Sequence, residues 1–127
     1  MPAQPKVELL FVGDIYGGYK VAHVSKGIRD IAAKADLVSI NVESPLTDHD
    51  TPFRDKTIYL KNSPATLTVL RELSTDIACL ANNHACDWGG KGLADTRRLL
   101  AENSIAAVGA GRDLGEAEAP VIVERRR

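Results

Sequence analysis

The chain has 127 residues, of which 44% are hydrophobic and 26% charged, with a formal net charge of -1. This is ordinary composition for one globular domain and argues against intrinsic disorder. The 16 Lys and Arg residues are balanced by 17 Asp and Glu residues, so no nucleic-acid partner is expected. The apolar run near the start is far shorter than the about 20 residues of a membrane span. Because the first residues also lack the pattern of a signal peptide, we expect a cytoplasmic protein.

Strand-like and helix-like stretches alternate along the first half of the chain. An apolar, β-rich run at 7–12 is followed by apolar residues at helical spacing within 20–35. A second strand is expected at 37–42. A polar loop with two prolines follows over 44–55, and a short extra strand is expected at 57–60.

The second half continues the alternation. Ser63 and Pro64 have the residue types of an N-cap and a first helical position, and Leu67, Leu70 and Leu73 suit the buried side of the helix that follows. The remaining expected elements are a strand at 76–81, a helix at 93–103, a strand at 105–108 and a last strand at 119–123. The order predicts an α/β fold with a mostly parallel sheet, right-handed crossovers and flanking helices. The nearly continuous apolar strand at 7–12 suits a sheet that is covered on both faces.

Polar residues follow three of the predicted strands. They are Asp14 after the first strand, Asn41 and Glu43 at the end of the second, and Asn82, Asn83, His84 and Asp87 after the third. The carboxyl ends of parallel strands share one edge, which is where ligands bind in such sheets. Carboxylate, amide and imidazole groups without thiolates suit Mn²⁺, Fe²⁺ or Zn²⁺. Buried carboxylates are costly without a cation, which also favours a metal site.

Each of these residues also has a purely structural interpretation. Asp14 could cap the following turn and Glu43 could be a solvated loop residue, and the sequence does not separate these roles from ligation. Asn82 is expected to stabilise a turn, whereas Asn83 is not. For Asp87 the favoured role is capping of the next helix.

Other polar residues near these strand ends have ordinary explanations. His84, taken alone, is more often structural than catalytic. The loop cations Arg54, Lys56 and Lys61 are expected on a solvated face, with approach to an anionic substrate as the alternative.

Several motifs together resemble one protein family. Gly13-Asp14, NVESPLT at 41–47 and ANNHACDWG at 81–89 are similar to the CapA family of bacterial poly-γ-glutamate capsule biosynthesis proteins. The resemblance extends from about residue 7 to residue 123. This resemblance implies membership of the calcineurin-like metallophosphatase superfamily. The implied fold is half of an α/β/β/α sandwich, with residues 1–127 forming one partial domain.

The resemblance also implies roles for the strand-end residues. Asp14 and Asn83 would be metal ligands, Glu43 would take the place of the metal-bridging carboxylate, His84 would protonate the leaving group or steady the phosphate, and Asn41, Asn82 and Asp87 would support them. The cofactor would be a pair of Mn, Fe or Zn ions that clamp phosphoryl oxygens and activate water. The substrate would contain phosphate or be related to polyglutamate. Tyr16 stands where the superfamily usually has a histidine.

The family is longer than this chain, and its later histidine motif has no counterpart among the three histidines present. We therefore expect an N-terminal half with little activity by itself and with an exposed apolar face that favours self-association. Two alternatives stay open. One is a phosphodiesterase unrelated to capsule, because the opening segment 10–15 is similar to bacterial 2′,3′-cyclic nucleotide phosphodiesterases. The other is a non-catalytic binding module.

Overall fold

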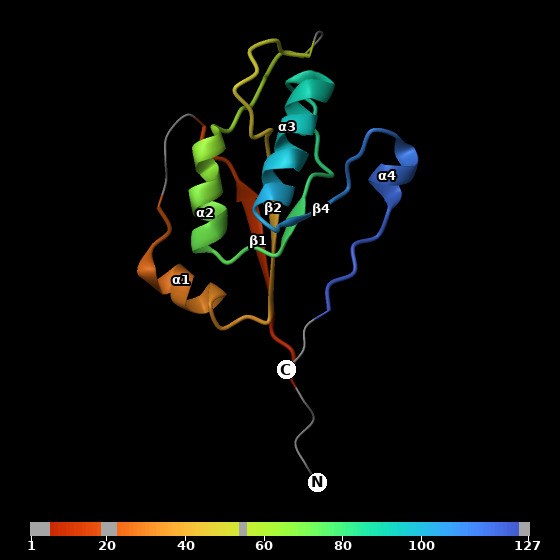
Figure 1. Cartoon of the computed structure of the whole chain (residues 1–127). Coiled ribbons are helices and arrows are strands. Elements are labelled where there is room, and N and C mark those ends of the chain that lie inside the picture. Colours follow the sequence, from red (N-terminus) through yellow and green to blue (C-terminus); the bar gives the residue numbers. More distant parts are fainter. Residues whose placement is uncertain (1–5, 19–22, 54–55, 125–127) are drawn as a thin grey trace.

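A four-stranded sheet forms the centre of the computed structural model, which describes residues 6–18, 23–53 and 56–124 (Figure 1). The strands are β1 (Leu9–Ile15), β2 (Leu37–Val42), β3 (Ile77–Cys79) and β4 (Ala106–Val108). They lie side by side in chain order, and every neighbouring pair is parallel. The helices are α1 (Lys26–Ala32), the 3₁₀ helix η1 (Pro64–Thr66) that leads into α2 (Leu67–Glu72), α3 (Gly89–Glu102) and α4 (Leu114–Glu118). The predicted α/β class with a parallel sheet is confirmed.

The helices α2 and α3 cover one face of the sheet (Figure 1). A strand order that follows the chain order has this consequence, because right-handed crossovers that all step in one direction stay on one side. On the other face Leu9 is 55% exposed and Phe11 is 72% exposed. An exposed apolar face is what the resemblance to half of a sandwich predicts. Cover on both faces, which the continuous apolar strand suited, is not seen among the described residues.

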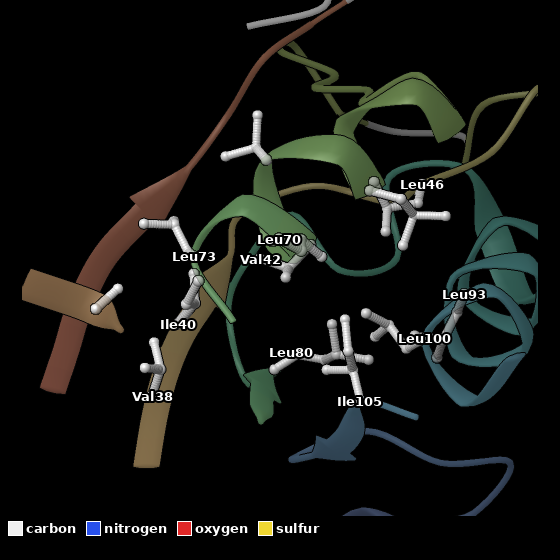
Figure 2. Close-up of a cluster of buried hydrophobic side chains, with 14 residues drawn as sticks. Val38, Ile40, Val42, Leu46, Leu70, Leu73, Leu80, Leu93, Leu100 and Ile105 are labelled. Atoms are coloured by element: carbon white, nitrogen blue, oxygen red, sulfur yellow. The ribbon is translucent and has the colours of Figure 1, made fainter. Parts of the chain in front are cut away.

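The hydrophobic core fills the space between the sheet and these two helices (Figure 2). Side chains alternate along β2, so Val38, Ile40 and Val42 are buried on the helix side. Leu70 on α2 and Leu100 on α3 face them and are fully buried. The β2 side chains that alternate with these buried ones therefore point to the opposite face of the sheet.

Several predicted elements differ in extent from those observed. The helix expected at 20–35 is observed only as α1, and residues 20–22 of the expected range lie outside the described structure. Before α1, the N–H of Val24 donates to the Glu72 carboxylate at 2.7 Å. In a longer helix this N–H would donate to a backbone carbonyl of the preceding turn, so the tertiary contact replaces a helical hydrogen bond. Neither the strand expected at 57–60 nor the one at 119–123 forms, and α4 was not predicted.

The loop between β2 and η1 is built into the core. Leu46 is fully buried and forms an isolated parallel bridge with Asn62. The side chain of Asn62 accepts a hydrogen bond from the N–H of Gly17 at 2.8 Å and donates to the carbonyl of Ser44 at 3.2 Å. This buried amide thus joins the segments that leave β1 and β2, and it fixes the carboxyl ends of the two strands relative to each other.

Among the described residues, no helix has the length and apolar character needed to cross a membrane.

The end of the described chain is held by charged groups around Glu116 on α4. Arg112 donates to the Glu116 carboxylate from its backbone N–H and from its guanidinium. The guanidinium of Arg97 on α3 lies 3.0 Å from Oε2 of the same carboxylate. Hydrogen bonds from Arg112, with a smaller contribution from Arg97, lower the pKa of Glu116 from 4.5 to about 2. A carboxyl with a lowered folded-state pKa contributes stability above its unfolded pKa and loses it as the pH falls.

We expect the free energy of unfolding of the wild type to fall toward that of a Glu116→Gln variant as the pH decreases from 4.5 to about 2. Denaturant titrations at several pH values check this. A difference between the two proteins that stays constant across this window would contradict the assignment.

Candidate functional site at the carboxyl ends of the strands

A β-bulge in β1 sets the position of Asp14. Val12 pairs with Ile40, but Asp14 already pairs with Asn41, so Gly13 is the extra residue. A bulge re-aims the side chains that follow it and is common beside functional sites. Here it brings Asp14 level with the end of β2, and nothing in the apolar pattern of the sequence indicated it.

Two carboxylates meet at the side chain of Asn41. The Nδ2 group of Asn41 donates to Oδ1 of Asp14 at 2.7 Å and to Oε2 of Glu43 at 2.8 Å. One amide nitrogen therefore bridges two acids at the carboxyl ends of neighbouring strands. The predicted convergence of these residues at one sheet edge is what the structure shows.

Asn82 connects the third strand end to this pair. Its Nδ2 donates to Oδ1 of Asn41 at 3.1 Å and to the carbonyl of Val42 at 3.0 Å. Its Oδ1 accepts from the N–H of His84 at 3.0 Å, which is the side-chain turn expected of an asparagine at this position. Asn82 thus supports both the turn and the orientation of Asn41.

His84 lies between Glu43 and a buried aspartate. Its Nε2 is 3.9 Å from Oε1 of Glu43, which is a close approach and not a hydrogen bond. Its Nδ1 is 2.7 Å from Oδ2 of Asp87. An ionised Asp87 can only accept, so Nδ1 carries the proton and Nε2 faces the carboxylate side of the site.

Asp87 has a different role from the one the sequence favoured. It was expected to cap the next helix, but Trp88 occupies the N-cap position of α3 and no side-chain cap hydrogen bond forms there. Instead the Asp87 side chain is completely buried and accepts from Lys56 Nζ, from the Leu60 N–H and from His84. Burial alone would raise its pKa, but these three hydrogen bonds outweigh that effect and hold the pKa of Asp87 below its usual range.

The loop cations also differ from expectation. The Lys61 side chain is 6% exposed and forms an ion pair with Asp50. Its Nζ lies 4.4 Å from the centre of the Trp88 ring. Lys56 is partly buried and donates to Asp87 and to the backbone carbonyl of Asn83. The solvated-face interpretation of these two lysines is therefore wrong, and Arg54 lies outside the described residues. The charge of these lysines and their place in a loop did not predict these contacts, because the partners come together only when the loop is folded.

Asn83 lies beside the strand-end hydrogen bonds, and its backbone carbonyl accepts from Lys56 Nζ at 2.7 Å. The residue is exposed, and it borders a hollow of about 510 Å³ at the carboxyl ends of β3 and β4. Leu80, Ala110 and Cys86 also line this hollow, and among the described residues no charged side chain does. An uncharged space therefore lies directly beside the acidic cluster.

The donor types at the strand ends suit a hard divalent cation, but their number does not complete a metal centre. Among residues 6–18, 23–53 and 56–124, no group of three His, Cys, Asp or Glu side chains is placed to hold one metal ion. Between Asp14 and Glu43 lies the Nδ2 group of Asn41, which donates to both carboxylates. This group offers the two acids hydrogen bonds, but it carries no positive charge as a metal ion would. The described residues by themselves therefore do not make up a metal centre.

Comparison with known proteins identifies the family. A family model described as "Bacterial capsule synthesis protein PGA_cap" matches residues 3–127. The chain belongs to this family. It is 32% identical over 125 residues to the PGA biosynthesis protein CapA of Bacillus subtilis, covering 91% of this chain and 33% of that protein.

Two other relatives agree with this assignment. The capsule biosynthesis protein CapA of Bacillus anthracis is 31% identical over 120 residues, covering 85% of this chain and 29% of the relative. A probable polyglutamine synthesis accessory protein of Mycobacterium tuberculosis, Rv0574c, is 38% identical over 89 residues, covering 69% and 23%. The chain thus spans about a third or less of the length of these relatives. The strand-end cluster lies within the residues that the family model matches.

Proposed function

We propose that this chain acts in capsule or poly-γ-glutamate biosynthesis and supplies part of a metal-dependent phosphoesterase site. Membership of the PGA_cap family supports the biological role. The observation that supports the chemistry is the convergence of Asp14 and Glu43 on one amide, with His84 Nε2 close to Glu43.

The residues divide the work by their chemistry. Asp14, Glu43 and the exposed amide of Asn83 offer oxygen donors of the kind that Mn²⁺, Fe²⁺ or Zn²⁺ binds. Further ligands would come from outside the described residues. A bound cation would neutralise the charge of a phosphoryl group at this edge.

His84 is the candidate proton donor. Its Nδ1 is held by Asp87, which fixes the ring and leaves Nε2 toward the acidic cluster. In the protonated ring the Nε2–H can pass its proton to a leaving-group oxygen that lies within hydrogen-bond distance. The uncharged hollow beside Asn83 would receive the organic part of such a phosphoester.

Thermal and denaturant unfolding with Mn²⁺ test the proposal. At a free concentration about 100 times the dissociation constant, the cation should raise the free energy of unfolding by about 2.7 kcal/mol. A Glu43→Gln variant should lose this increase. A Glu102→Gln variant should keep it, because Glu102 is an exposed carboxylate on α3 that pairs with Arg98. A cooperative transition that Mn²⁺ does not shift would favour a non-catalytic binding module.

We expect the isolated chain to release no measurable nitrophenolate from bis(p-nitrophenyl) phosphate with Mn²⁺, because the described ligand set is partial. Absorbance assays with millimolar metal measure this directly. Turnover that Glu43→Gln abolishes would show that the chain already holds a complete centre. Turnover unaffected by that substitution would indicate a contaminating enzyme.

A further inference from the structure

Lys56 contacts two different parts of the turn that follows β3. Its Nζ donates to the side chain of Asp87 and, at 2.7 Å, to the backbone carbonyl of Asn83. The side chain is 28% exposed, whereas Asp87 is fully buried. One ammonium group therefore joins the residue proposed as a ligand to the residue that holds His84.

The second carboxylate oxygen of Asp87 is also fully used. It accepts from the Leu60 N–H at 2.7 Å and lies 2.7 Å from Nδ1 of His84. Lys56 and Leu60 both belong to the loop before η1, so this loop contacts both carboxylate oxygens of Asp87. Without the ammonium group, one oxygen of the carboxylate loses its partner, and the carboxylate is freer to rotate away from the imidazole.

We propose that Lys56 is a positioning residue that acts through Asp87 to fix the orientation and tautomer of His84, and through the Asn83 carbonyl to fix the turn that carries both. The contacts stand independently of the reaction, but their importance for catalysis rests on the proposed function. Lys56 does not need to touch a substrate in this role, which distinguishes it from a lysine that binds an anion directly.

A matched pair of variants separates positioning from loop anchoring. Lys56→Met removes the ammonium group at Asp87. Lys61→Met removes a buried lysine from the same loop, whose contacts go to Asp50, the His49 carbonyl and the Trp88 ring. Both variants are expected to lower the melting temperature, so stability alone does not distinguish them.

The distinguishing signal is the ¹⁵N spectrum of the His84 ring in the metal-free chain, at a pH where the imidazole is neutral. The wild type should show one dominant tautomer with Nδ1 protonated. In Lys56→Met the minor tautomer should grow by about fivefold or more, because the bond made by one ring nitrogen determines the tautomer. Lys61→Met should retain the wild-type signal. An unchanged His84 spectrum in Lys56→Met, or an equal change in Lys61→Met, would overturn the proposal.

A measurement on the wild type covers the case in which Lys56→Met does not fold. The ammonium protons of Lys56 should exchange with water about tenfold more slowly than those of Lys26, which is 80% exposed. Equally fast exchange would overturn the proposal. Neither readout needs metal or substrate, so failure of the Mn²⁺ experiment leaves this test intact.

Discussion

Replacing Asp87 with alanine should lower the free energy of unfolding by about 3 kcal/mol, because removing one partner of a buried ion pair leaves the other charge uncompensated. This is the low end of the usual range, since the Lys56 side chain is 28% exposed and water compensates part of its charge. The substitution also leaves the Leu60 N–H without its acceptor. Urea titrations at neutral pH measure the loss.

An exposed aspartate in the same region provides the control. Asp48→Ala should change the free energy of unfolding by less than about 0.5 kcal/mol, because Asp48 is exposed. Asp87→Asn should lie between the two, as the amide can still accept one hydrogen bond but carries no charge. Equal stabilities of Asp87→Ala and Asp48→Ala would show that the loop is not anchored through this carboxylate.

The second large effect is expected at the centre of the core. Leu70→Ala should cost roughly 3–4 kcal/mol, because Leu70 is completely buried between α2 and the sheet and its removal leaves a cavity. Leu114→Ala on α4 is the matched control, since Leu114 is 71% exposed and should contribute less than about 0.5 kcal/mol. Differential scanning calorimetry and denaturant titration both measure the difference.

A small effect of Leu70→Ala would contradict the packing shown in Figure 2, where Leu70 lies among Val42, Ile40 and Leu73. An unfolding transition of Leu70→Ala that becomes less cooperative but keeps the wild-type midpoint would also contradict this packing. Either result would mean that α2 does not hold the sheet in the way the structure indicates.

The sequence by itself determined the fold class and the place of the candidate site. Continuous apolar strands alternating with helical spacing predict a parallel sheet, and parallel strands bring Asp14, Glu43 and His84 to one edge. The same local signals predicted the turn at Asn82 and the start of the helix at Ser63, whose side chain accepts from the Ala65 N–H. The turn and the helix start depend on residues close in the chain, and the shared edge follows from the parallel order of the strands.

Tertiary structure decided the remaining features, because they depend on contacts between distant residues. The bulge at Gly13 arises from pairing with β2, and the pattern of β1 alone does not contain it. The role of Asp87 depends on a loop about 30 residues earlier that supplies Lys56 and the Leu60 N–H. Capping was the natural local expectation for an aspartate before a helix. Burial made the long-range partners decisive, since a carboxylate removed from water must take every available donor.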